Sequence, residues 1–188
     1  IPGAGFHTDN ENIEPVSAEL TWEDKTNIIS EVSYRAEHRD LIFTASGTEG
    51  NALISARDES GNIVWSWHIW VTDQPIEQTY VNYQGMSYVV LDRNMGATRN
   101  NRGTGDEWKE SVGVYYQWGR KDPLAIYHYN SSDSPMTIEQ TIRENTRYIY
   151  ENNWDEMGNC QLWGNTKTIY DPCPLGYKVM TQTAWPGL

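Results

Sequence analysis

The strongest constraint on the fold is an alternation of side chains through residues 62–71. Successive side chains of a strand point to opposite faces of a sheet, so this run predicts a strand with two different faces. One face would carry Ile63, Trp65, Trp67, Ile69 and Val71, and the other Val64, Ser66, His68 and Trp70. We expect this strand to lie in a packed sheet with its indole rings in the core.

A second run, residues 51–57, precedes this strand and is joined to it by Asp58-Glu59-Ser60-Gly61. The loop ends in the glycine that a positive φ favours, so the two runs predict a β-hairpin. No helical period competes within residues 16–72. The sequence therefore predicts a small antiparallel β-sandwich for residues 1–75.

Composition changes after residue 75. Residues 1–75 contain one of the twelve Tyr, whereas residues 76–188 contain the other eleven, and the nine Trp divide into four and five. We therefore predict two units, 1–75 and 76–188, in a chain that is mainly β, with α+β character in the second half.

The second unit shows one hairpin and one helix signal. Gln78–Tyr83 and Ser87–Asp92 alternate around Gln84-Gly85, which predicts another hairpin. Thr137 and Gln140 have the spacing of a capping box, which predicts the start of a helix. Three isoleucines fall on one face of this helix if it extends over residues 137–150: Ile138, Ile142 and Ile149.

The net charge of the chain limits the classes of partner that are expected. The formal net charge is −12, from 14 basic and 26 acidic residues, and phosphate binding needs a basic face, so nucleic acid is not expected as a partner. No apolar run approaches the roughly 18 residues of a membrane span, and the first residues resemble no secretion signal.

The two cysteines, Cys160 and Cys173, are too far apart in sequence for a C-x-x-C metal or redox pair. A structural disulfide between them is predicted, with free thiols as the alternative. His68 is expected to be a structural histidine, because it lies mid-strand between two Trp. The Asp92-Arg93 pair follows an apolar strand, and we expect it to tie loops together by charged hydrogen bonds.

No catalytic motif is present. The sequence has no G-x-S-x-G, no H-E-x-x-H, no P-loop and no G-x-G-x-x-G, so we expect no enzymatic activity and no cofactor. The acidic stretch Asn152–Glu156 is rich in oxygen ligands but lacks the W-N-D order of calcium-dependent lectins. A solvated loop is the simpler interpretation.

Four blocks of sequence occur in an order that resembles a known family. They are residues 61–70 (GNIVWSWHIW), 91–97 (LDRNMGA), 115–123 (YYQWGRKDP) and 169–179 (IYDPCPLGYKV). Together they resemble the FISUMP-type paralogous domain of surface and fimbrillin-like proteins of Bacteroidetes.

This resemblance implies export to the cell surface or outer membrane, usually by a lipoprotein route. It also implies a C-type-lectin-like fold for residues 76–188, and a fimbrillin or immunoglobulin-like type for the β-sandwich of residues 1–75. Residues 185–188 fall where family members run on, so we expect this lectin-like domain to be incomplete.

The function that the resemblance favours is recognition or attachment, by an adhesin-like or pilus-associated subunit that is not an enzyme. Its partners would be other surface or pilus subunits, or a host or bacterial glycan or protein. A surface carbohydrate-binding module for glycan capture is the alternative, and an enzyme on a related lectin-like scaffold would need catalytic cysteines or a metal triad. The candidate ligand contacts are aromatic: Tyr127, Tyr129, Trp154 and Trp163.

Overall fold

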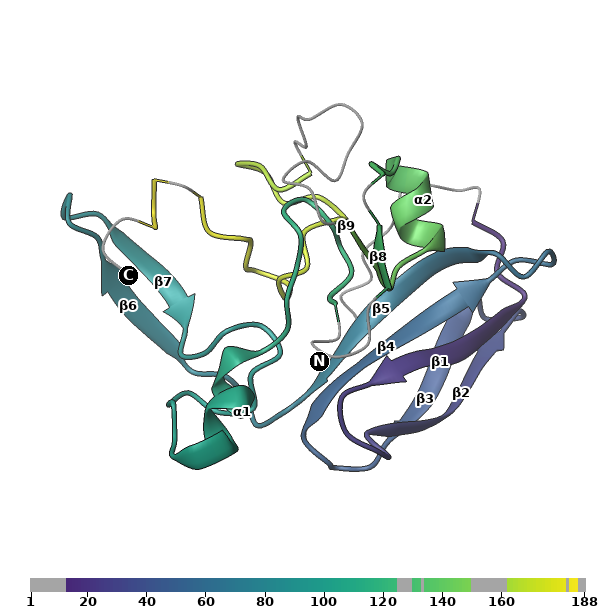
Figure 1. Cartoon of the computed structure of the whole chain (residues 1–188), viewed down its shortest axis with the longest axis horizontal. Helices are drawn as coiled ribbons and strands as arrows, with labels where there is room; N and C mark the ends of the chain where they lie inside the picture. The colour runs from purple at the N-terminus through teal and green to yellow at the C-terminus, as the bar shows by residue number, and fades with distance from the viewer. Residues whose placement is uncertain (1–12, 125–129, 133, 150–161, 182, 186–188) are drawn as a thin grey trace.

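The computed structural model describes residues 13–124, 130–132, 134–149, 162–181 and 183–185. Strand residues greatly outnumber helical ones there, so the predicted mainly β fold is confirmed (Figure 1). The elements in chain order are β1 (Ser17–Glu23), β2 (Ile29–Arg35), β3 (Asp40–Ala45), β4 (Gly50–Arg57), β5 (Ile63–Val71), β6 (Glu77–Val81), β7 (Ser87–Leu91), a 3₁₀ turn η1 (Gly105–Glu107), α1 (Trp108–Val112), β8 (Asn130–Ser132), α2 (Ile138–Arg143) and β9 (Arg147–Ile149).

Strand β4 is the centre of the molecule. It is the middle strand of an antiparallel sheet with the order β1-β4-β5, and every residue from Gly50 to Ala56 is buried. Neighbouring residues of a strand face opposite ways, and both Leu53 and Ile54 are fully buried. Both faces of this sheet are therefore covered by other parts of the chain.

The antiparallel pair β2-β3 covers the first face, with β2 packed against β1 and β4. Ile28 and Ile29 form a buried cluster there with Ala52 and Ile54 of β4. This gives a sandwich-like arrangement, as the sequence predicted. The β4-β5 hairpin is also confirmed, with Gly61 at φ 80° in its loop.

A β-bulge in β1 serves the second face. The pairing of β1 with β4 shifts register between Leu20 and Trp22, so Leu20 lies opposite Ile54 while Trp22 lies opposite Leu53. Such a bulge re-aims side chains locally. Trp22 thereby joins Leu53 and the partly buried Val114 in a second apolar cluster.

The indole rings of β5 differ from the prediction. Trp65 is buried, but Trp67 is 41% exposed, so the expectation that all of these rings lie in the core is wrong for Trp67. Trp67 is exposed because β5 is an edge strand of its sheet, whereas the covering strand β2 packs on β1 and β4.

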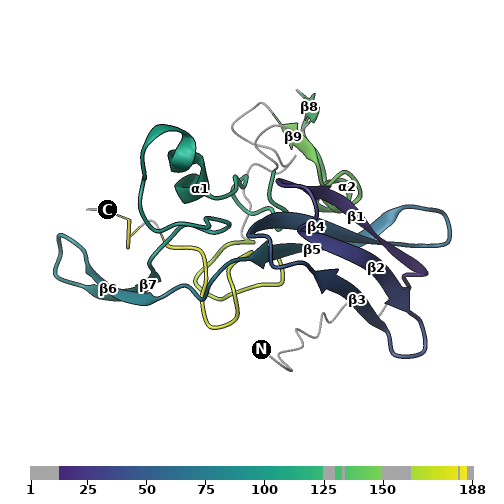
Figure 2. The ribbon, with the colours of Figure 1, turned by 90° about the horizontal axis from the view of Figure 1, so that it is seen from below.

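Residues after 75 form a ribbon and a folded-back segment. The predicted second hairpin is confirmed as the antiparallel pair β6-β7, which projects from the end of the molecule away from β1–β3 (Figures 1 and 2). Residues 162–181 run between this ribbon and β5 in both views, and α2 lies over β5. The predicted boundary after residue 75 thus falls in the connection between β5 and β6.

The helix near 137–150 begins as predicted and ends early. Thr137 is its N-cap, and Thr137 and Gln140 form the expected capping box. Helix α2 ends at Arg143, however, and residues 147–149 form β9, parallel to β8. A non-local contact explains the difference: the side-chain amide of Gln117 bonds both the N–H and the C=O of Ile149, which holds that residue extended.

Replacing Ile54 by Ala tests whether the β4 core holds the sandwich together. We expect a loss of about 2–5 kcal/mol in the free energy of unfolding, because a fully buried isoleucine leaves a cavity. Urea unfolding measures it. Ile42→Ala, at a position that is 41% exposed on β3, is the matched control and should cost much less. Equal losses in the two variants would contradict the assignment of the core.

Candidate functional site

The second face of the central sheet carries buried polar side chains beside its apolar cluster, and the rest of the chain bonds to them. Asn145 donates from Nδ2 to Ser55 Oγ at 2.9 Å, and Trp70 donates from Nε1 to the Ala97 carbonyl at 3.1 Å. Ser55 is fully buried and Ser66 nearly so. A buried polar group must be hydrogen-bonded to avoid a desolvation cost, so these side chains determine how residues after 75 dock.

A directed chain of hydrogen bonds crosses this interface. Asn51 Nδ2 lies 2.7 Å from Asp24 Oδ2 and 2.8 Å from the Gly96 carbonyl, both of which only accept. Asn51 Oδ1 must therefore accept from His68 Nε2, at 2.9 Å. His68 Nδ1 is then the acceptor for the Tyr116 hydroxyl, also at 2.9 Å. Protein groups occupy both ring nitrogens, as expected of a structural histidine.

Close packing accompanies this chain at Gly96. Gly96 has φ 79°, and a Cβ there would lie 2.7 Å from Asn51 Oδ1. A side chain at this position would push the loop away from β4 and break the bond between Asn51 and the Gly96 carbonyl. Glycine is needed here because it tolerates the positive φ and because it has no Cβ to meet Asn51 Oδ1.

A buried ion pair between Lys121 and Asp122 packs against β5. Lys121 Nζ bonds Asp122 Oδ1 at 2.6 Å, and Ser66 Oγ donates to the same oxygen at 2.7 Å. Lys121 also lies 4.5 Å from the centroid of the Trp65 ring, which adds a cation–π contact. Burial lowers the pKa of Lys121, while Asp122 opposes that change.

Arg120, the preceding residue, is 2% exposed. Its Nη1 bonds Gln117 Oε1 at 2.9 Å and the Arg147 carbonyl at 2.6 Å. Its Nε and Nη2 are buried without a hydrogen-bond partner among the described residues. Desolvation lowers the pKa of Arg120 to about 10.

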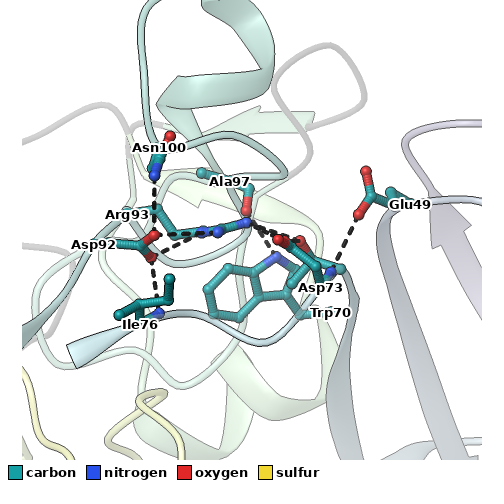
Figure 3. Close-up of polar contacts among 9 residues, drawn as sticks. Glu49, Trp70, Asp73, Ile76, Asp92, Arg93, Ala97 and Asn100 are labelled. Carbon is teal, nitrogen blue, oxygen red and sulfur yellow. Dashed lines mark hydrogen bonds and ion pairs between the residues drawn. The ribbon is translucent and has the colours of Figure 1, made fainter.

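Arg93 ties the loop after β7 to the connection between β5 and β6 (Figure 3). It bonds Asp92 Oδ1 through Nε at 3.0 Å and Asp73 Oδ1 through Nη1 at 2.5 Å. Asp92 in turn accepts from Ile76 N at 3.2 Å and from Asn100 Nδ2 at 3.1 Å. The hydrogen bond with Asp92 raises the pKa of Arg93, and the same bond lowers the pKa of Asp92. The predicted loop-tying role of Asp92-Arg93 is confirmed.

Three aromatic rings form a ladder from the interior to the surface. Tyr116 meets Trp163 at 6.1 Å between ring centroids, and Trp163 meets Trp118 at 5.3 Å with planes 60° apart. Trp163 is fixed by a bond of 2.9 Å from Nε1 to the Tyr170 carbonyl. Trp118 is 49% exposed. Trp163, a predicted ligand contact, thus lies half-buried beneath an exposed indole.

Asp171 organises the segment around Cys173. Its Oδ1 accepts from Lys167 Nζ at 2.8 Å and from Cys173 N at 3.0 Å, and its Oδ2 accepts from Val179 N at 2.9 Å. Cys173 is a free thiol, and burial raises its pKa to about 12. The free Cys173 agrees with the free-thiol alternative and gives no support to the predicted disulfide, whose other member, Cys160, lies outside the described residues.

The other predicted contacts, Tyr127, Tyr129 and Trp154, lie outside the described residues. Within the described part of the chain, no three His, Cys, Asp or Glu side chains are grouped so as to hold a metal ion. In that same part, no helix is long and apolar enough to cross a membrane.

Comparison with known proteins gives no match to a family model, to a curated protein or to a solved structure. The FISUMP-type resemblance therefore stays a prediction that rests on the four sequence blocks.

Sequence reasoning missed two features of this region. Trp118 alternates with buried neighbours, and only the tertiary structure distinguishes its exposed indole from a core residue. The buried fork of Arg120 carried one usable signal: three consecutive charged residues, Arg120-Lys121-Asp122, directly before a proline in an aromatic segment.

The Tyr116 hydroxyl can be tested by Tyr116→Phe. Removing it leaves His68 Nδ1 without its donor, so we expect a loss of about 1–3 kcal/mol in the free energy of unfolding. Denaturant unfolding measures this. Tyr115→Phe, at a neighbouring tyrosine that is 53% exposed, should change stability by less than about 0.5 kcal/mol. An unchanged Tyr116→Phe protein would show that the chain of bonds is dispensable.

Stability should fall with acid because of His68. Burial lowers its pKa to about 4 from the ordinary value of 6.5. The unfolded chain gains this proton below about pH 6.5 and the folded chain only near pH 4, so the folded state loses about 3 kcal/mol across that window. Urea unfolding between neutral pH and about pH 4.5 measures the slope.

His68→Gln should remove most of that slope, whereas His38→Gln, in the turn between β2 and β3, should keep it. Carboxylates whose pKa is lowered, such as Asp92, lose their contribution only below about pH 4, outside the window. A slope that persists in His68→Gln would assign it to another group.

Proposed function

We propose that this chain is a non-enzymatic, exported cell-surface protein, adhesin-like or pilus-associated, that acts in recognition or attachment. The sequence support is the four-block resemblance to FISUMP-type surface proteins. The structural support is the aromatic ladder of Tyr116, Trp163 and Trp118, which ends in an exposed indole.

The Trp118–Trp163 contact carries the proposal. Tryptophan is enriched where binding energy concentrates, because one ring offers a large apolar area with few rotatable bonds. Trp118 is half exposed, while Trp163 beneath it is held by a hydrogen bond and by Tyr116. An exposed ring on a fixed support is suited to contact with a partner.

The β6-β7 ribbon offers a second contact surface. Four of its large apolar side chains, including the ones that flank its strands, are more than half exposed: Ile76 (64%), Val81 (55%), Tyr83 (71%) and Val89 (59%). Apolar groups gathered on one exposed element mark interaction surfaces in soluble proteins. This surface suits association with another subunit better than catalysis.

A carbohydrate-binding module for glycan capture is less favoured. Flat sugar platforms use exposed rings that are coplanar, whereas the planes of Trp118 and Trp163 are 60° apart. The pair therefore offers one exposed ring, that of Trp118, with the ring of Trp163 inclined to it. Attachment through a single aromatic anchor agrees better with this arrangement.

Trp118→Ala tests the proposal. In adhesion of the purified chain to immobilised cells, glycans and surface proteins, we expect at least tenfold weaker binding, which is about 1.4 kcal/mol. Trp108→Ala on α1, at a Trp that is 41% exposed, is the matched control and should bind as the wild type does. Equal losses in both variants, or turnover of any substrate by the purified chain, would overturn the proposal.

A further inference from the structure

Arg120 has an unusual environment for a buried guanidinium. The side chain is 2% exposed, and its Nε and Nη2 have no hydrogen-bond partner among the described residues. An arginine retains its charge, and a buried donor without an acceptor costs free energy comparable to a lost hydrogen bond. Ser66 and Asn51 at this interface are paired, whereas the buried Trp22 Nε1 is the other described side-chain donor there without a partner.

The two unpaired groups form one edge of the guanidinium. Nε–H and Nη2–H point the same way along the side of the group, and this edge, here called the Arg120 fork, matches two oxygens of one anion. The opposite nitrogen, Nη1, is already used by Gln117 and by the Arg147 carbonyl. These bonds hold the fork in a fixed orientation.

Local charge favours an anion with one negative charge. Arg120, Lys121 and Asp122 are consecutive and have buried side chains, which gives two cations and one anion. Asp122 Oδ1 is taken by Lys121 and Ser66, and among the described residues no carboxylate is hydrogen-bonded to Arg120, on which Asp122 acts through its charge alone. A carboxylate supplies one charge and two oxygens, whereas a phosphate brings more of both.

We propose that the Arg120 fork binds the carboxylate of a ligand. Trp118 and Arg120 leave the same turn, in which Arg120 N–H donates to the Gln117 carbonyl at 2.9 Å, so the exposed indole and the fork are positioned by one piece of backbone. The proposal deepens the recognition function above and rests on it for the source of the carboxylate, an acidic sugar or an acidic side chain.

The test is a titration followed by NMR of arginine Nε–H groups in the full chain. The probes are sodium acetate, glucuronate and glutarate at constant ionic strength, with acetamide and glucose as neutral counterparts. We expect a saturable shift of the Arg120 Nε–H signal with the carboxylates only. Tighter binding of glucuronate would indicate a sugar source, and tighter binding of glutarate an acidic side chain.

Two lysine variants complete the experiment. Arg120→Lys keeps the charge but loses the fork, so carboxylate affinity should fall about tenfold or more. Arg143→Lys changes an arginine on α2 whose side chain is 52% exposed, and its titration should match that of the wild type. A merely structural Arg120 would affect stability without any response of its Nε–H to acetate.

No saturable shift in the wild-type chain would overturn the proposal, and this measurement does not depend on the folding of Arg120→Lys. Because Arg120→Lys lacks the Arg120 Nε–H, its carboxylate binding is followed by backbone amide signals, and an affinity equal to that of the wild type would overturn the proposal as well. If Trp118→Ala weakens adhesion while acetate has no effect, the proposal that the Arg120 fork binds a carboxylate is wrong and the recognition function stands. If acetate binds but the chain adheres to nothing, the recognition function is wrong.

Discussion

The structure depends on burying β4 from both sides. One face of β4 presents Ala52 and Ile54 to the β2-β3 pair, and the other presents Asn51, Leu53 and Ser55 to residues after 75. The polar groups on this second face would each cost about 1–3 kcal/mol if buried alone. Their partners Gly96 and Asn145 come from distant loops. Hydrogen-bond satisfaction therefore specifies the docking, while apolar burial drives it.

Local signals in the sequence were sufficient to predict which strands and helices form, but not where each of them ends. Strand alternation, the loop ending in Gly61 and the Thr137 capping box each depend on residues a few positions apart, and the structure confirms them. The end of α2 depends on Gln117, about 30 residues earlier in the chain, whose amide holds Ile149 extended. Contacts of this range are invisible to periodicity. The same holds for the exposure of Trp67, which follows from the edge position of β5.

The candidate site was harder to predict than the fold, because its chemistry depends on which polar groups remain unpaired. His68 and Asp92-Arg93 could be interpreted correctly as structural from their neighbours in sequence. For Arg120, the sequence gives a charged side chain next to an aromatic segment. Only the three-dimensional arrangement shows that Nη1 is used while Nε and Nη2 are not.

The four blocks that carry the family resemblance meet around the second face of the sheet. The first supplies Ser66 and His68, the second Gly96, and the third Tyr116 and Asp122. The fourth supplies Tyr170, whose ring lies 6.0 Å from that of Trp65 and whose carbonyl holds Trp163. Most of these residues bond to one another and not toward solvent.

A residue in a motif can serve the fold or the function, and the positions of these residues in the structure distinguish the two roles. Residues that hold a loop to a sheet give information about the fold, and a fold hosts many functions. Specificity must then come from groups that do not hold the fold together, and the proposals above rest on two of them among the described residues, the exposed indole of Trp118 and the fork of Arg120. Among the described residues, the buried side chains at positions 120–122 carry two cations and one anion, although the formal net charge of the chain is −12. A ligand that neutralises Arg120 would therefore have to bring its own carboxylate to the interface that holds the two parts of the chain together.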